Sequence, residues 1–113
     1  MLYKKVKIKN LFLYPSNPQP TTLAIKRIRA ADFILIGPGS LYTSILPNFL
    51  IDKVVKEINE SKAIKIFILN LLTQPGETDS FKASDHLGEF LKISNLKKLI
   101  LFWQVRQNLK KFF

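Results

Sequence analysis

Two short runs of apolar residues mark the centre of the chain. Residues 33–36 (FILI) and 64–69 (IKIFIL) lie about 30 positions apart. Neither run alternates regularly between apolar and polar residues, which predicts strands covered on both faces, as in parallel sheets. Between them, apolar residues from Leu50 to Ile58 recur at helical spacing, and Pro47 suits the first turn of such a helix. A strand, a helix and a strand at this spacing predict a right-handed βαβ unit.

The flanking segments extend this pattern. Residues 22–30 are predicted to be a helix, and a further helix is predicted from an N-cap at Ser84 to about residue 92. Residues 9–14 are a candidate strand that ends at a turn-rich segment. Residues 96–103 form either a last strand or a tail without a definite fold. The sequence therefore predicts an α/β fold with a mostly parallel sheet.

Length and composition limit the classes that this chain can belong to. Its 113 residues suffice for one compact domain but not for two, and 47% of them are hydrophobic. The chain has no cysteine, which excludes disulfides, thiolate metal sites and a cysteine nucleophile. No apolar stretch approaches the roughly 20 residues of a membrane span. The expected location is the cytoplasm.

The net charge of +10 resides entirely in the two ends of the chain. Residues 1–30 carry seven positive charges, residues 31–89 carry a net charge of −3, and residues 90–113 carry six positive charges. Fifteen of the eighteen basic residues are lysine, whereas arginine is the residue that most often reads base edges. A basic module for RNA stays an alternative, but no specific nucleic-acid partner is expected.

The loop after the first predicted strand is a candidate anion-binding site. The sequence there is IGPGSLYTS, residues 36–44, and a predicted helix follows. Glycines allow a sharp turn and close approach of a ligand to the main chain. Amides and hydroxyl groups at a helix start favour an anion, with Ser40 expected as the N-cap. The alternative is a plain turn joining strand to helix, since the segment matches no named nucleotide motif.

A second polar loop follows the second predicted strand, at residues 70–79 (NLLTQPGETD). If the strands are parallel, both loops leave the same edge of the sheet, where ligands of α/β proteins bind. Glu77 and Asp79 are candidates for a metal, a ribose hydroxyl or a base, or they only cap the next helix. His86, the single histidine, is expected to have a surface or packing role. No catalytic set can be assigned from these residues, and beyond the open alternative at Glu77 and Asp79 no metal site or cofactor is expected.

Together these segments resemble a known family. Residues 31–48, residues 70–79 and the sequence ASDH at 83–86 are similar to signatures of the gluconeogenesis factors, within the 2-phospho-L-lactate transferase-like superfamily. The similarity covers roughly residues 8–92, and residues 93–113 form a divergent basic tail. The family's glycine-rich first nucleotide loop has no counterpart in this sequence. The resemblance implies a single partial domain, 1–113, with an incomplete Rossmann-like three-layer fold.

The resemblance also implies a function. Family members bind a nucleotide sugar of the UDP-N-acetylglucosamine type and support growth and cell shape on gluconeogenic carbon sources, in a regulatory role. The alternatives are a transferase of phosphorylated substrates and a truncated product without function, whose exposed sheet edges favour self-association. By carry-over, the residues expected to line the phosphate and nucleotide site are Gly37, Pro38, Gly39, Ser40, Thr43, Asn70, Thr73 and Gln74.

Overall fold

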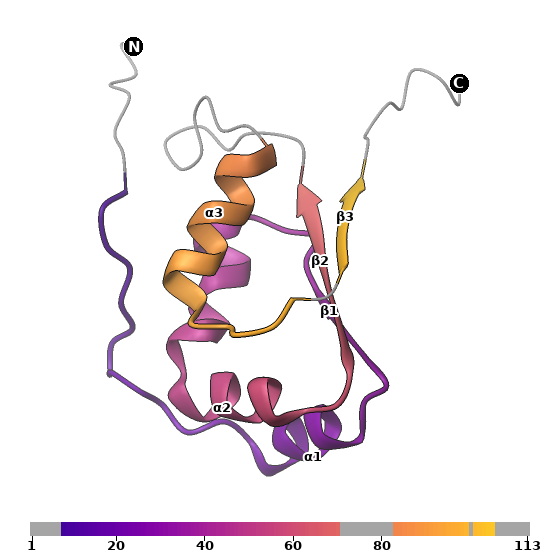
Figure 1. Ribbon diagram of the computed structural model, residues 1–113. Helices are drawn as coiled ribbons and strands as arrows, with labels where there is room; N and C mark the ends of the chain where they lie inside the picture. Colours follow the sequence, from indigo (N-terminus) through magenta and orange to yellow (C-terminus); the bar gives the residue numbers. More distant parts are fainter. Residues whose placement is uncertain (1–7, 71–82, 100, 106–113) are drawn as a thin grey trace, which may run out of the picture.

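The computed structural model describes residues 8–70, 83–99 and 101–105, in which helices and strands alternate (Figure 1). In chain order the elements are α1 (Thr22–Ala30), β1 (Phe33–Ile36), the π-helix η1 (Leu41–Ile45), the 3-10 helix η2 (Leu46–Leu50), α2 (Asp52–Glu60), β2 (Ile64–Asn70), α3 (Ala83–Ser94) and β3 (Leu101–Val105). The predicted α/β class is confirmed.

The three strands form one parallel sheet in the order β1-β2-β3. Ile36 of β1 lies opposite Phe67 of β2, and Asn70 lies opposite Val105 of β3. The predicted βαβ unit and the parallel direction are confirmed. The prediction of a last strand is also confirmed, although it begins at residue 101, and the alternative of a tail without a fold is wrong for residues 101–105.

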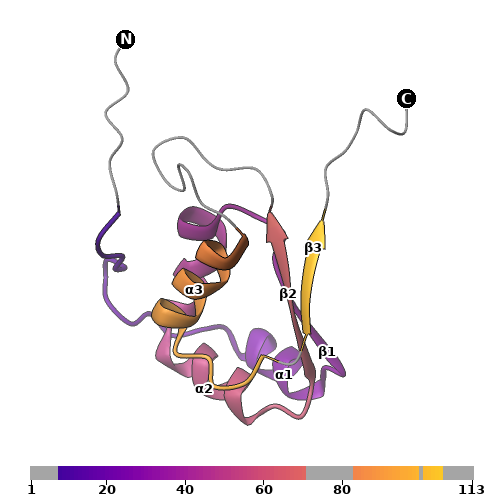
Figure 2. The same ribbon diagram turned by 45° about the horizontal axis from the view of Figure 1, so that its top comes forward.

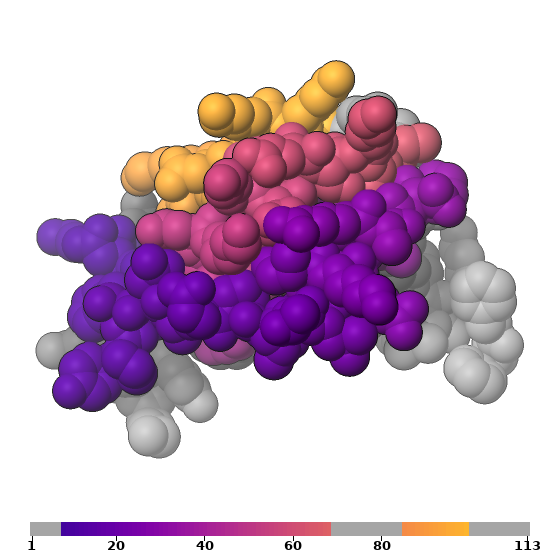
Figure 3. Space-filling model, turned by 90° about the horizontal axis from the view of Figure 1, so that it is seen from below, coloured from indigo at the N-terminus to yellow at the C-terminus, as the bar shows by residue number. Residues whose placement is uncertain are grey.

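The expected strand at residues 9–14 is wrong. Residues 8–13 have no regular secondary structure, because they pair with no strand of the described sheet. Ile8 and Leu11 pack instead against the edge of the core. Viewed from below, the N-terminal segment and α1 form a continuous band across this end of the molecule (Figure 3). The predicted helix at 22–30 is confirmed, and the Thr21 hydroxyl oxygen caps it by accepting from the Ala24 amide at 3.1 Å.

The single helix expected between β1 and β2 is interrupted. Ile51 is extended, with φ −93° and ψ 105°, and separates η2 from α2. Pro47 does lie in a first turn, but in that of η2. The break exposes a new helix start, and the Asn17 side-chain oxygen accepts from the Asp52 amide there at 3.2 Å. A contact between residues 35 positions apart therefore lies at the start of α2.

The core lies between the helices and one face of the sheet. Phe90 of α3 is fully buried, and its ring stacks on Phe67 of β2 with 4.6 Å between the ring centroids. Phe49 of η2 meets Phe90 edge to face at 5.0 Å and 88°. Such aromatic pairs add to the free energy gained by burying apolar area. The three rings thus join α3, β2 and η2.

Glu57 joins α1 to α2. It is 4% exposed and accepts two hydrogen bonds from the Arg29 guanidinium, at 2.8 Å from Nε and 2.6 Å from Nη2. Lys53 approaches the same carboxylate at 3.2 Å. The hydrogen bonds from Arg29, opposed by desolvation and aided by Lys53, lower the pKa of Glu57 to about 2. Opposite charges four residues apart, such as Lys53 and Glu57, are typical of the outer face of a helix, but here α1 covers Glu57.

The helices α2 and α3 lie on the same side of the sheet in both ribbon views (Figures 1 and 2). On the other side, Phe33 is 59% exposed and Leu35 is 60% exposed. The described part of the chain therefore supplies two of the three layers that a Rossmann-like fold has. No helix within the described ranges is long and apolar enough to cross a membrane.

Candidate functional site

The loop that follows β1 is held against the main chain of β2. Gly37 has φ +98°, a conformation that favours glycine. A Cβ at this position would lie 2.6 Å from the Ile68 carbonyl oxygen, so no side chain fits there. The loop is thereby anchored at the carboxyl edge of the sheet. A glycine was expected here for close approach of a ligand, and the described contact is with β2.

The turn after this glycine closes through Ser40. The amides of Ser44 and Ile45 both donate to the Ser40 carbonyl oxygen, at 2.9 and 3.0 Å. Ser40 occupies the N-cap position with extended backbone, as predicted. Its side chain makes no capping hydrogen bond, so the expected hydroxyl cap is wrong. The first turn is a π-helix, whose wider ring places its first amides differently from those of an α-helix.

The π-helix η1 separates apolar from hydroxyl side chains. Leu41, Tyr42 and Ile45 are buried. Thr43 and Ser44 are exposed. Burial, with a smaller contribution from Glu89 of α3, raises the pKa of the Tyr42 phenol to about 12. The apolar residues thus fix the turn in the core, while two hydroxyl groups stay available at the surface beside the glycine loop.

Asn48 is a residue that the sequence reasoning did not assign to the site. Its side-chain amide donates to the Ser44 carbonyl oxygen at 2.8 Å and to that of Ile45 at 3.3 Å. These two carbonyls end η1, so Asn48 holds the turn from its C-terminal side. The signal that could have indicated Asn48 is its position in the sequence LPN, shortly after Thr43 and Ser44. Gly37, Pro38, Ser44 and Asn48 also line one side of a cavity of about 280 Å³.

Both predicted loops begin at the same edge of the sheet. Because β1 and β2 are parallel and Ile36 lies opposite Phe67, the loop at Gly37 starts beside Ile68, shortly before β2 ends at Asn70. Asn70 is the last residue of β2. Of the other predicted site residues, Thr73 and Gln74 lie outside the described residues, as do Glu77 and Asp79. The structure thus brings together Gly37, Pro38, Gly39, Ser40 and Thr43, and places Asn70 at the start of the second loop.

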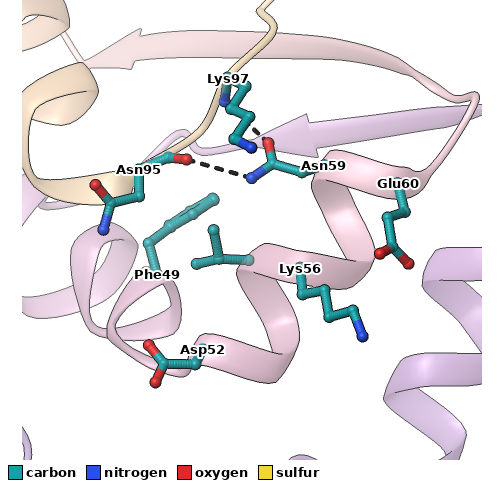
Figure 4. A pocket seen from close by; sticks show the side chains of 8 residues that line it. Phe49, Asp52, Lys56, Asn59, Glu60, Asn95 and Lys97 are labelled. Atoms are coloured by element: carbon teal, nitrogen blue, oxygen red, sulfur yellow. Dashed lines mark hydrogen bonds between the residues drawn. The ribbon is translucent and has the colours of Figure 1, made fainter.

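A second cavity, of about 330 Å³, lies away from these loops (Figure 4). It is built from η2, α2 and the segment after α3. The Asn59 side chain crosses it, donating to the Asn95 carbonyl oxygen at 3.2 Å and accepting from the Lys97 amide at 2.9 Å. Asn95 has φ +56°, which turns the chain at this contact. Since both ends of the Asn59 amide are used, we interpret it as a structural link between α2 and the segment that follows α3.

His86 lies in α3 and is 5% exposed. Burial lowers the pKa of its imidazole, with a smaller opposing effect of Asp85, which favours the neutral ring. This agrees with a packing role. In the part of the chain that is described, no group of three or more His, Asp or Glu side chains is placed to hold a metal ion.

Comparisons with known proteins agree on one family. The family profile described as 2-phospho-L-lactate transferase CofD matches residues 2–109. The protein named "Putative gluconeogenesis factor" from Aquifex aeolicus is 53% identical over 90 residues, which are 80% of this chain and 27% of that protein. The "Gluconeogenesis factor" of Listeria innocua is 51% identical over 80 residues, covering 71% of this chain and 25% of the relative.

A solved structure shares the fold. The crystal structure of a Bacillus halodurans protein superposes with a TM-score of 0.83 at 38% sequence identity, covering 96% of this chain and 36% of that one. The chain therefore spans about a quarter of the length of the curated relatives and just over a third of this structure.

Proposed function

Because this chain belongs to the 2-phospho-L-lactate transferase CofD family, we propose that it binds the phosphate groups of a nucleotide sugar of the UDP-N-acetylglucosamine type. The loop from Gly37 to Ser40 carries this function, with Thr43 beside it. Asn70, Thr73 and Gln74 are proposed to approach the same ligand from the second loop.

The observation that carries the proposal is the position of the Gly37 loop. It leaves a parallel strand at the carboxyl edge, where α/β proteins bind ligands, and leads directly into a helical turn. The first amides of a helical turn lack partners within the helix, and phosphate oxygens accept from such groups. The exposed Thr43 and Ser44 hydroxyls lie next to these amides.

The proposed role is regulatory, in growth and morphogenesis on gluconeogenic carbon sources. It is supported by the relatives named gluconeogenesis factor, which are about half identical to this chain over the matched residues. A second candidate, transfer of a group between phosphorylated substrates, is favoured by the description of the matching family. If the chain catalyses such a transfer, a product is expected to form when the protein is mixed with a nucleotide-activated donor and an acceptor.

The test is thermal unfolding of the purified chain with UDP-N-acetylglucosamine, with UDP and with uridine. If the loop binds phosphate, both phosphate-bearing ligands stabilise the fold and uridine does not. At a ligand concentration of 100 times Kd the stabilisation is about 2.7 kcal/mol.

Equal responses to UDP and uridine would contradict the loop assignment, because the base alone would account for binding. The same comparison in the Bacillus subtilis relative, which is 51% identical over 81 residues, tests the site within a longer chain. Absence of any response there as well would sink the proposal.

A further inference from the structure

Asn48 is exposed, yet its side-chain amide is bonded to the main chain of η1. The amide nitrogen donates to the Ser44 carbonyl oxygen at 2.8 Å and to the Ile45 carbonyl oxygen at 3.3 Å. Only the nitrogen can face two carbonyl oxygens, because the amide oxygen has no hydrogen to donate. Pro47, the residue before it, has no amide hydrogen that could donate to this turn. The donors at this end of η1 therefore come from a side chain.

These two carbonyl groups belong to the peptide units that close η1. Because a peptide unit is planar, the Ser44 carbonyl moves together with the Ile45 amide, and the Ile45 carbonyl moves together with the Leu46 amide. The Ile45 amide donates to the Ser40 carbonyl oxygen at 3.0 Å. The Leu46 amide donates to the carbonyl oxygen of Leu41. The side chain that bonds the two carbonyls thus fixes the two donors that give η1 its wide turn.

The glycine loop is held at its two ends by different contacts. At its start, Gly37 lies against the main chain of β2, where a Cβ would meet a carbonyl oxygen of that strand at 2.6 Å. At its end, the Ser40 carbonyl oxygen accepts from the amides of Ser44 and Ile45. The first contact depends on the missing side chain of glycine. The second depends on a peptide unit that Asn48 holds in place.

We propose that Asn48 is a positioning residue of the phosphate site, an inference that rests on the proposed function. It acts through the loop at residues 37–40 and not by contact with the ligand. Through the main chain of Ser44, it also keeps the exposed Thr43 and Ser44 hydroxyls beside that loop. A site that is arranged before the ligand arrives binds it more tightly, because less conformational freedom is lost on binding.

The test measures affinity in Asn48→Ala, which removes both donors. Calorimetric titration with UDP-N-acetylglucosamine is expected to give a Kd about tenfold higher than in the unchanged protein, comparable to the loss of one hydrogen bond to a charged group. The matched control is Asn59→Ala, which also removes two hydrogen bonds between a side-chain amide and the main chain, away from the loop. Both changes are expected to lower Tm slightly, and the control is expected to leave the Kd unchanged.

Amide hydrogen exchange without ligand reports on the turn itself. Asn48→Ala is expected to speed exchange of the Ser44 and Ile45 amides about tenfold, because opening of the turn no longer breaks the two side-chain hydrogen bonds. Asn59→Ala is expected to leave both rates unchanged. Asn48→Ser introduces a hydroxyl that can donate to the carbonyl four residues earlier, so it is expected to restore part of the protection and of the affinity. It also supplies a second variant if Asn48→Ala does not fold.

The results separate this inference from the function on which it rests. If the unchanged protein binds neither UDP-N-acetylglucosamine nor UDP, the proposed function fails and the positioning role fails with it. If the unchanged protein binds the ligand and Asn48→Ala binds it equally well, the positioning role alone is overturned. Faster exchange without a change in Kd has that meaning, because Asn48 would then serve the stability of η1 only. An equal rise in Kd for Asn59→Ala would also overturn it.

Discussion

Gly37 adopts a backbone conformation that other residues rarely adopt, at the point where the loop touches β2. Gly88, by contrast, is exposed within α3, and a Cβ there would meet no heavy atom within 4 Å. The two glycines therefore differ in their physical role. At residue 37 the missing side chain allows a contact between two main chains, whereas at residue 88 it only weakens a helix.

Gly37→Ala is expected to lower the free energy of unfolding by about 2 kcal/mol or more, from the positive φ and the clash with the Ile68 carbonyl. Gly88→Ala is the matched control and is expected to raise it by about 0.5–1 kcal/mol, through helix propensity. Urea denaturation measures both. If the two variants have equal stability, the described loop conformation is wrong.

Gly39→Val is expected to abolish phosphate binding. A Cβ at residue 39 would already lie 3.3 Å from the Ser44 Cβ, so a branched side chain fills the space in front of the first turn. The measurement is titration with UDP-N-acetylglucosamine, after circular dichroism has established that the variant folds. A folded Gly39→Val protein with unchanged affinity would count decisively against the loop as the binding site.

At the scale of the elements, an ion pair joins α1 to α2. The Arg29–Glu57 pair joins residues 28 positions apart, and its carboxylate is covered while its guanidinium stays 63% exposed. A lowered pKa means that the folded state holds the carboxylate ionised. The pair stabilises the fold above the pKa of Glu57 in the unfolded chain, about 4.3. That stability is lost as the pH falls towards 2.

Glu57→Gln is expected to lower Tm at pH 7, and the difference from the unchanged protein is expected to shrink between pH 5 and pH 2. The reason is that protonation of Glu57 removes the ionic interaction with Arg29 from the unchanged protein, and the substitution has already removed this interaction from the variant. Calorimetry across this pH range measures it. Glu60→Gln, on an exposed position of the same helix, is the control. A difference that stays constant down to pH 2 would rule out this role for Glu57.

At the scale of the whole molecule, stability depends on a small core built against one face of the sheet. Phe90 contacts both Phe67 and Phe49, and so links α3 to the strand and to η2. A domain of this size has a total stability of roughly 5–15 kcal/mol, so the loss of one such ring is a large fraction of it. The open face contributes no comparable burial among the described residues.

Phe90→Ala is expected to cost about 3–5 kcal/mol, which lowers Tm steeply or unfolds the chain. Leu91→Ala changes the neighbouring residue, which is 42% exposed, and is expected to cost much less. Thermal unfolding followed by circular dichroism compares the two. Similar losses from both changes would mean that α3 does not pack as described.

Local patterns along the chain were enough to predict most of the elements. The runs at 33–36 and 64–69, the helix at 22–30 and the loop at Gly37 follow from side-chain period and from glycine chemistry, which act between near neighbours. The candidate residues Gly37, Gly39, Ser40 and Thr43 lie together because they are adjacent in sequence. A resemblance to a family then supplied the expected ligand, which no pattern of spacing could.

The tertiary structure decided what depends on distant partners. Residues 9–14 have the composition of a strand, but a strand needs a neighbour to pair with. After the break at Ile51, the first amide of α2 donates to the side chain of Asn17, which is distant in the sequence. Glu57 is charged and lies on an amphipathic helix, and only the position of Arg29 makes it a buried residue. The sequence by itself determined most of the local conformations of this protein. Contacts across 28 to 36 positions determined the burial and packing of its elements. The reason is that hydrogen bonds and apolar burial are gained only where the folded chain brings distant partners together.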